Sequence, residues 1–163
     1  MITKPILHLV TLALVALPAA AQTLPAPHAS LKGEIERSIA KGISFLQSKQ
    51  SADGSWSDAT QPALTALPLR AVAGDPNRPQ GEPVPPWAQK GYAFLLGTQK
   101  HDGGLYNKGL GTYNTSIGLM ALLAANDSAY DAAARKARRF LINQQQDFDA
   151  KGKTDNPLDG GVG

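Results

Sequence analysis

The sequence predicts an all-α protein that is built from helical hairpins repeated along the chain. Two observations point to this class. Three segments with apolar residues at helical spacing each lead into a turn of the Asp-Gly type, and a second apolar segment of helical length follows the first two turns. Self-similarity with a period of about 20–50 residues is typical of repeat proteins, whose units bury their apolar faces against one another.

The repeat is clearest in the first two copies. They begin at Lys41 and Lys90, which are 49 residues apart, and they align without a gap. The third copy begins at Lys136, and its Asp-Gly-Gly follows an insertion. The residues of the structural repeat motif are Lys41, Gly42, Phe45, Gln50, Asp53, Gly54 and Trp56, then Lys90, Gly91, Phe94, Gln99, Asp102, Gly103 and Gly104, and finally Gln145, Asp159, Gly160 and Gly161.

The first helix of each copy is predicted by its apolar stripe. We expect these helices at residues 32–47 and 89–98, and the third copy shows the same periodicity up to its insertion. Helix ends inferred in this way are uncertain by about two to four residues. The stripes are Ile35, Ile39, Gly42, Ile43 and Leu46, then Trp87, Gly91, Phe94 and Leu95, and finally Tyr130, Ala133, Ala134, Ala137 and Leu141.

Second helices are expected at residues 62–73 and 115–125. In the first of them, Leu64, Leu67 and Ala71 share one apolar face, and Pro68 predicts a kink. The second is apolar nearly all round, which predicts burial on every side. Residues 74–87 contain five prolines and are expected to form a stiff connector without helix. A domain boundary is the alternative, but the matching repeats on both sides favour a single domain.

Residues 1–21 have the layout of a secretory signal peptide. A lysine precedes an apolar stretch that is shorter than the roughly 20 residues a membrane span needs, and three alanines follow at the expected cleavage position. We expect cleavage after Ala21, export to the periplasm or the medium, and no stable membrane span; an uncleaved anchor is the alternative. Residues 22–30 are then a loose lead-in. The repeat domain covers 31–163, with repeats at about 31–74, 87–126 and 128–163.

The composition excludes several classes of function. A net charge of +3 is small, whereas nucleic-acid binding needs a concentrated basic face. The one dense basic stretch, Arg135 to Arg139, is interpreted as the solvated face of a helix. The chain has no cysteine, so disulfides, thiolate zinc sites and cysteine nucleophiles are excluded. We expect no metal, no cofactor and no nucleic-acid partner.

The first copy, from Lys41 to Trp56, resembles the QW motif of squalene-hopene and oxidosqualene cyclases. The second copy has Leu105 in place of the tryptophan, and its Asp-Gly-Gly is similar to repeats of protein prenyltransferase β-subunits. The resemblance covers roughly residues 31–163. It implies an α/α toroid, also called an α/α barrel, of which this chain would supply about two and a half hairpins. It also fits a structural role for the motif: the Asp-Gly pair makes a tight turn, glutamines reach helix ends, and Trp56 shields them from water.

The catalytic motifs of that superfamily are incomplete in this sequence. The cyclase acid motif Asp-x-Asp-Asp is matched only in part, by Asp147-Phe148-Asp149-Ala150, which we interpret as a solvated loop. The prenyltransferase zinc site needs a cysteine. The weak ligand candidates are His101, in the second turn, and Tyr106 and Tyr113, which flank a Gly-rich loop and could line the same opening; an exposed turn residue is the alternative for His101. Catalytic residues stay unassigned.

These observations predict an exported repeat module without complete catalytic machinery, whose ligand is apolar or glycan-like. The alternative is the N-terminal part of a toroid-fold enzyme, either a triterpene cyclase or a polysaccharide lyase, with its catalytic residues further along. The sequence reaches Gly163 before a second helix has followed the third turn. We therefore expect a fragment of a longer protein, or a short protein that closes its unfinished ring by self-association. Expressed alone, the chain is expected to be marginally stable or oligomeric.

Overall fold

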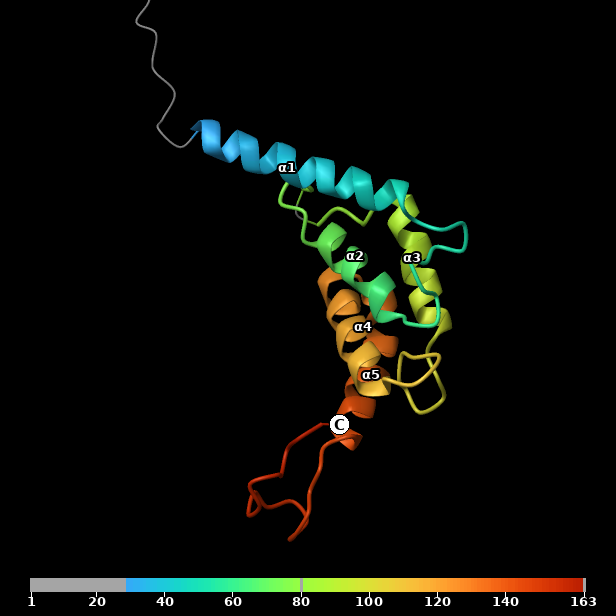
Figure 1. Cartoon of the computed structure of the whole chain (residues 1–163), viewed down its shortest axis with the longest axis vertical. Helices are drawn as coiled ribbons and strands as arrows, with labels where there is room; N and C mark the ends of the chain where they lie inside the picture. The colour runs from blue at the N-terminus through green and yellow to red at the C-terminus, as the bar shows by residue number, and fades with distance from the viewer. Residues whose placement is uncertain (1–28, 80, 163) are drawn as a thin grey trace, which may run out of the picture.

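The computed structural model describes residues 29–79 and 81–162, and these are helical as predicted. The elements are α1 (Ala29–Ser48), α2 (Ala63–Ala73), α3 (Pro86–Gly97), α4 (Gly111–Ala125), a short 3-10 helix η1 (Ser128–Tyr130) and α5 (Asp131–Asn143) (Figure 1). Within these residues no β-strand forms, and only two isolated bridges pair Gln99 with Leu105 and Gln145 with Val162. The expected signal peptide and its cleavage point lie outside the described residues.

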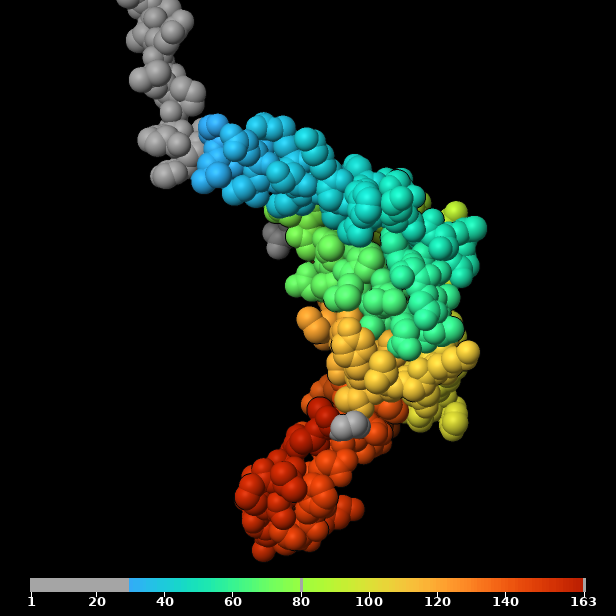
Figure 2. All heavy atoms as spheres, in the orientation of Figure 1, coloured from blue at the N-terminus to red at the C-terminus, as the bar shows by residue number. Residues whose placement is uncertain are grey.

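The helices pack in two layers. The most extensive contact joins α2 to α4, while α3 packs on α2 and α5 packs on α4. Helix α1 lies across one end of the molecule and touches α2 only slightly. In the space-filling view the chain is an arc hollowed on one side, and α2 and α4 form the middle of that hollow side (Figure 2).

Three helices begin earlier than predicted, and the first of them, α1, starts at Ala29 in place of residue 32. Residues 74–87 were expected to contain no helix, but Pro86 begins α3, because the fixed φ of proline suits the first turn of a helix. Helix α4 begins at Gly111, four residues before the expected start at residue 115. The preceding Leu110 has a left-handed backbone, with φ of 49°, so the end of the Gly-rich loop turns directly into the helix.

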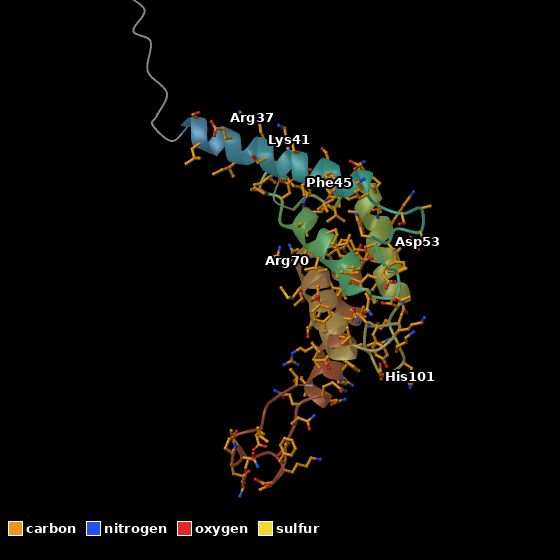
Figure 3. All side chains as sticks on the ribbon, viewed as in Figure 1. Arg37, Lys41, Phe45, Asp53, Arg70 and His101 are labelled. Carbon is orange, nitrogen blue, oxygen red and sulfur yellow. The ribbon has the colours of Figure 1, made fainter. Side chains whose placement is uncertain are left out.

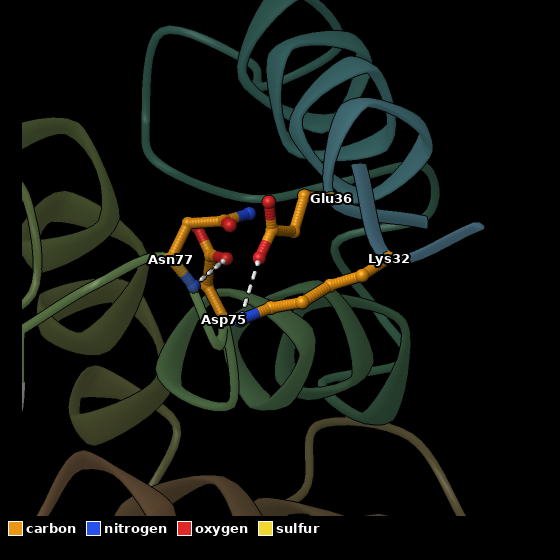
Figure 4. A network of polar contacts seen from close by, with 4 residues as sticks. All are labelled: Lys32, Glu36, Asp75 and Asn77. Atoms are coloured by element: carbon orange, nitrogen blue, oxygen red, sulfur yellow. Dashed lines mark hydrogen bonds and ion pairs between the residues drawn. The ribbon is translucent and has the colours of Figure 1, made fainter. Parts of the chain in front are cut away.

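The remainder of the connector is non-helical, as expected. The Asp75 carboxylate accepts a 2.9 Å hydrogen bond from the Asn77 backbone N–H, which is a local turn typical of aspartate (Figure 4). The same view shows the exposed Lys32–Glu36 ion pair of α1. The Arg78 guanidinium donates to the carbonyl oxygens of Ala73 and Glu82 and so ties the connector to the end of α2. One arginine therefore fixes both ends of this loop.

The buried faces correct several details of the expected stripes. On α2 the packed face is not Leu64, Leu67 and Ala71; it consists of Ala63, Thr65, Ala66, Leu69 and Val72. On α3 the fully buried Tyr92 joins Ala88, Gly91 and Leu95, while Trp87 and Phe94 are only partly covered. On α5 Phe140 is buried rather than Leu141, and Tyr130 belongs to η1. Small residues carry much of the packing because α2 closely approaches both α4 and α3.

Two helices are less buried than expected. Helix α4 is not covered on every side, because Met120 is 56% exposed and Leu123 is 63% exposed. In α1 no residue from Ser30 to Ser48 is buried, and Ile35 and Phe45 of the predicted stripe and motif are more than half exposed. Both observations have the same cause: within the described residues, no helix lies over these faces.

Candidate functional site

The three Asp-Gly turns are built in the same way. In each, the residue after the motif glutamine donates its backbone N–H to a carbonyl oxygen beyond the glycine, with N···O distances of 2.9, 2.8 and 2.7 Å for Ser51–Ser55, Lys100–Gly104 and Gln146–Gly161. The turn glycines have positive φ, at 91° for Gly54, 95° for Gly103 and 80° for Gly160. The repeat inferred from sequence is thus a repeat of backbone geometry, including the third copy with its insertion.

The motif side chains serve these turns. Gln50 and Gln99 donate to the carbonyl oxygens of Gly54 and Gly103, at 3.0 and 3.1 Å, and Gln99 also reaches the Ala133 carbonyl oxygen of α5 at 3.0 Å. The buried Trp56 donates its indole N–H to the Leu46 carbonyl oxygen at 2.8 Å, near the end of α1. These contacts satisfy backbone groups that helix ends and turns leave open.

Buried threonines belong to the same repeat, although the sequence analysis did not single them out. Thr65 accepts a hydrogen bond from the Trp56 backbone N–H at 3.1 Å, and Thr115 accepts one from the Leu105 N–H at 2.9 Å. Both threonines are fully buried near the start of the second helix of their hairpin. Their similar spacing from the turns, nine residues after Trp56 and ten after Leu105, was a signal in the sequence.

Each of the first two turns docks on the next outer helix. A Cβ atom added to Gly54 would lie 2.4 Å from the Lys90 carbonyl oxygen of α3, and one added to Gly103 would lie 2.5 Å from the Lys136 carbonyl oxygen of α5. These two contacts need glycine for close approach as well as for positive φ. The repeated Lys-Gly or Lys-Ala pair of the outer helix is therefore the receptor for the turn that precedes it.

Asn114 ties the two inner helices together, which sequence reasoning missed. Its fully buried side chain accepts from the Ala63 backbone N–H at 2.9 Å and donates to the Gln61 side chain and the Leu110 carbonyl oxygen, at 3.0 and 3.1 Å. A second cross-helix bond links the Tyr92 hydroxyl to the Ala121 carbonyl oxygen at 3.1 Å, and burial raises the pKa of this tyrosine. A polar residue inside an apolar helical segment was the only signal for Asn114.

His101 lies in a groove of about 470 Å3 between the second turn and α5. We refer to it as the basic groove; the ionisable residues that line it are His101, Asp102, Arg135, Lys136 and Arg139. Figure 3 shows His101 on the exposed edge of that turn (Figure 3). The stretch that we interpreted as a solvated helix face is indeed exposed, and three of its four basic side chains line this groove, while Arg138 does not. Asp102 also belongs to the turn, where it accepts from the Gly104 N–H at 2.9 Å.

The three candidate residues do not share one opening. The Tyr106 hydroxyl donates to the Asp102 carboxylate at 2.7 Å, and its ring lies 5.7 Å from that of Phe140. This hydrogen bond raises the pKa of Tyr106; for Asp102, burial acts to raise the pKa, but the bonds from Tyr106 and Gly104 outweigh it and the pKa is lowered. Tyr113 lines a separate hollow with Leu110, Gly111, Thr112 and Val162. The structure thus associates Tyr106 with the His101 turn and separates Tyr113 from it.

The open side of α2 and α4 is apolar. We call this surface the inner face and define it by Leu67, Ala71, Met120 and Leu123, all of which are exposed. It lies opposite the outer layer, because α3 and α5 cover the other sides of these two helices. Arg70 extends from the same side of α2. The inner face is formed by the residues whose predicted burial was wrong.

A polar pocket of about 500 Å3 lies at the opposite end of α2 and α4 from the turns. Arg78, Glu82, Asp127 and Ser128 line it. Among the described residues, no group of three or more His, Asp or Glu side chains is placed to hold a metal ion, and no helix is long and apolar enough to cross a membrane. The aspartates Asp147 and Asp149 instead hold the insertion through the Gly152 N–H and the Asn156 side chain.

Comparison of the chain with family models, with curated proteins and with solved structures gave no match.

Proposed function

We propose that this chain is an exported helical-repeat module of the terpenoid cyclase-like type, part of an α/α toroid, and that it binds an apolar ligand on its inner face. The observation that carries the proposal is the exposure of Leu67, Met120 and Leu123 on two adjacent helices. Large contiguous apolar surfaces are rare on free proteins and mark sites of interaction. Repeat proteins bind in this way on the concave side that their stacked units create.

The packing explains why the inner face is the apolar side of α2 and α4. The small residues of α2 and α4 face each other and the outer helices, so the larger Leu67 and Met120 remain on the open side. An apolar ligand gains about 25 cal/mol for each Å2 of apolar surface that it removes from water. Arg70, at the edge of the inner face, fits a ligand with one polar or anionic end.

The test uses Nile red, a neutral dye that fluoresces on apolar surfaces, and farnesol as its competitor. We expect Leu67→Glu combined with Leu123→Glu to weaken dye binding about tenfold or more, because each change places a charge in the apolar contact. Ile142→Glu is the matched control, since Ile142 is 46% exposed on α5, in the outer layer. The proposal would be contradicted if the double variant bound the dye as tightly as the unchanged chain. An equal loss of dye binding in the Ile142→Glu control would also contradict it.

A second candidate function is supported by the basic groove. Arg135, Lys136 and Arg139 meet His101 there, and guanidinium groups bind carboxylates and sulfates well through paired hydrogen bonds. The fitting ligand is an acidic glycan. This candidate includes the alternative that the chain is the front part of a toroid-fold polysaccharide lyase.

The acidic-glycan candidate is tested with polygalacturonate oligomers titrated at two salt concentrations. Arg135→Gln combined with Arg139→Gln should weaken binding about tenfold and reduce its salt dependence. Arg138→Gln, on the same helix but outside the groove, should leave it unchanged. Equal binding of duplex DNA would show charge attraction alone and would refute glycan recognition.

A further inference from the structure

The glycine of each docked turn contacts the lysine of the Lys-Gly or Lys-Ala pair on the next outer helix. The second residue of that pair is the receptor position. At the first such point, a Cβ atom on Gly91 would lie 2.8 Å from Leu69, 2.9 Å from Trp56 and 3.3 Å from the Gly54 carbonyl oxygen. At the second point the helix has Ala137, which is fully buried, with the Gly103 turn on the adjacent Lys136. The receptor position thus carries glycine in α3, where a Cβ atom would overlap its neighbours, and alanine in α5.

Helix α1 carries the same receptor, and none of the residues that the structure describes occupies it. Its residues Ile39, Gly42, Ile43 and Leu46 align with the buried Ala88, Gly91, Tyr92 and Leu95 of α3. A Cβ atom on Gly42 would meet nothing within 4 Å. Glycine is less favourable than alanine inside a helix, so the packing of the described residues does not account for Gly42, whereas it does account for Gly91.

The receptor on α1 is also a groove. The groove has a volume of about 500 Å3 and runs between α1 and the end of α2. Its walls are Ile39, Gly42, Ile43 and Leu46 on one side and Ala71 and Pro76 on the other. Phe45, at its edge, is 59% exposed. This groove suits a small turn that contains glycine and is flanked by apolar residues.

Among the described residues, the third turn contacts no outer helix in the way that the first two turns do. The third turn is fully formed, since Gly160 donates to the Gln146 carbonyl oxygen at 2.9 Å in the way that Gly103 donates to Lys100. Gly160 has φ of 80°, yet a Cβ atom there would meet nothing within 4 Å. Next to it, Leu158 is 65% exposed and Val162 is 53% exposed.

We propose that the chain associates head to tail, with the Asp159–Gly161 turn of one copy docked on the Lys41–Gly42 site of α1 in a second copy. The contact would reproduce between two molecules what Gly54 with Lys90 and Gly103 with Lys136 form within one. The two surfaces differ from each other, so the association is heterologous and extends to a closed ring or an open filament.

Charge complementarity favours a second copy as the occupant. The segment around the third turn has four carboxylates, at Asp147, Asp149, Asp155 and Asp159, against Lys151 and Lys153. Helix α1 and the residue after it carry Lys32, Arg37, Lys41 and Lys49 against Glu34 and Glu36. Figure 3 places Arg37 and Lys41 along α1, next to Phe45. The acidic segment and the basic helix lie at opposite ends of the arc, as head-to-tail contact requires.

The first experiment measures the oligomeric state of the purified full chain by sedimentation over a wide range of concentration. We expect the mass to rise with concentration, and Gly42→Leu to weaken the association about tenfold or more because its side chain fills the receptor. Gly42→Ala should preserve association, because α5 has Ala137 at this position. Gly33→Leu is the matched control, a second glycine of α1 whose Cβ would meet only the flexible Arg37 side chain.

The second experiment identifies the two surfaces. The chain has no cysteine, so Lys41→Cys and Gly161→Cys can each be made as the sole thiol. A short bis-thiol crosslinker should join them when the two variants are mixed and not when either is alone; Lys108→Cys in place of Gly161→Cys is the control. Crosslinking of either variant with itself would contradict a head-to-tail contact. A chain that stays monomeric, or a Gly42→Leu variant that associates unchanged, would overturn the proposal and leave the α1 groove to a different protein.

Discussion

Helices α1 and α3 occupy the same place in their repeats but differ in their surroundings. Both carry a Lys-Gly pair followed by Phe-Leu, and both precede an Asp-Gly turn. In α3 the residues Ala88, Gly91, Tyr92 and Leu95 are buried by α2 and by the first turn. In α1 the aligned Ile39, Gly42, Ile43 and Leu46 are half-buried or exposed.

The difference shows that the apolar stripe of an outer helix is buried by the hairpin that precedes it in the chain. The sequence of the helix itself does not decide its burial. A helical stripe identifies which residues can be buried, whereas the preceding turn and inner helix determine whether they are. Repeat proteins behave in this way because each unit packs only on its neighbours. The comparison leads to four predictions, of which the first two compare a docked position with an open one and the last two concern the docked turns.

The largest effect is expected when the docked tryptophan is removed. Trp56 is 4% exposed, contacts the Gly91 position of α3 and donates to Leu46. Trp56→Ala should lower the free energy of unfolding by about 3–5 kcal/mol. Phe45→Ala, at an aromatic residue of the same repeat that is 59% exposed, should cost about 0.5 kcal/mol or less. Denaturant unfolding of both variants checks the pair, and similar losses would show that α1 is packed in solution.

The second prediction compares the two aligned glycines. Gly91→Ala should destabilise the chain by about 1–3 kcal/mol, because the new methyl group overlaps Leu69 and Trp56. Gly42→Ala should stabilise it by about 0.5–1 kcal/mol through helix propensity. Thermal unfolding at low protein concentration measures both. A destabilising Gly42→Ala would show that something already contacts this position.

The third prediction concerns the two buried threonines. Thr65→Val and Thr115→Val each leave a buried backbone N–H, of Trp56 or Leu105, without its acceptor. Each should cost about 1–2 kcal/mol, and the two costs should be similar because the geometry repeats. Unfolding curves of the single variants test this, with Thr→Ser as a control that retains the acceptor. A negligible loss of unfolding free energy at either threonine would show that the geometry of that hairpin does not match the repeat.

The smallest effect is the pH dependence of the turns. Hydrogen bonds from Ser55 lower the pKa of Asp53, and bonds from Tyr106 and Gly104 lower that of Asp102 against the opposing effect of burial. A lowered folded-state pKa means that the stabilisation is present above the ordinary value of about 3.9 and is lost as the pH falls through the folded value. The melting temperature should therefore fall below about pH 4. In the variant that combines Asp53→Asn with Asp102→Asn, the fall in melting temperature below this pH should be smaller. An unchanged dependence of the melting temperature on pH would contradict the prediction.

Much of the fold could be predicted because the repeat depends on interactions between residues that are close in sequence. Positive φ at Gly54 and Gly103 and the glutamine contacts follow from residue types at fixed spacing. The orientation of α2 could not be predicted in this way, because Leu64, Leu67 and Ala71 form a plausible core stripe by hydropathy. The structure instead buries Ala63, Thr65, Ala66, Leu69 and Val72, and the two alanines among them permit close contact with α4.

The candidate sites were harder to predict than the turns. His101 was found from its position in a turn, but its meeting with Arg135 and Arg139 depends on how α5 packs beside that turn. Asn114 and Tyr92 were missed because their partners, Ala63 and Ala121, lie far along the chain and on other helices. Contacts of this kind come from tertiary packing, which a local pattern does not contain.

The first two Asp-Gly turns dock on the following outer helix, whereas among the described residues no turn occupies the receptor on α1. Amide hydrogen exchange of residues 39–46 and 88–95, measured at low and at high protein concentration, tests this difference. At low concentration residues 88–95 should be protected to nearly the global stability, while 39–46 should exchange through openings that cost little free energy. At high concentration protection of 39–46 should rise toward that of 88–95. Equal protection of both segments at every concentration would contradict the claim.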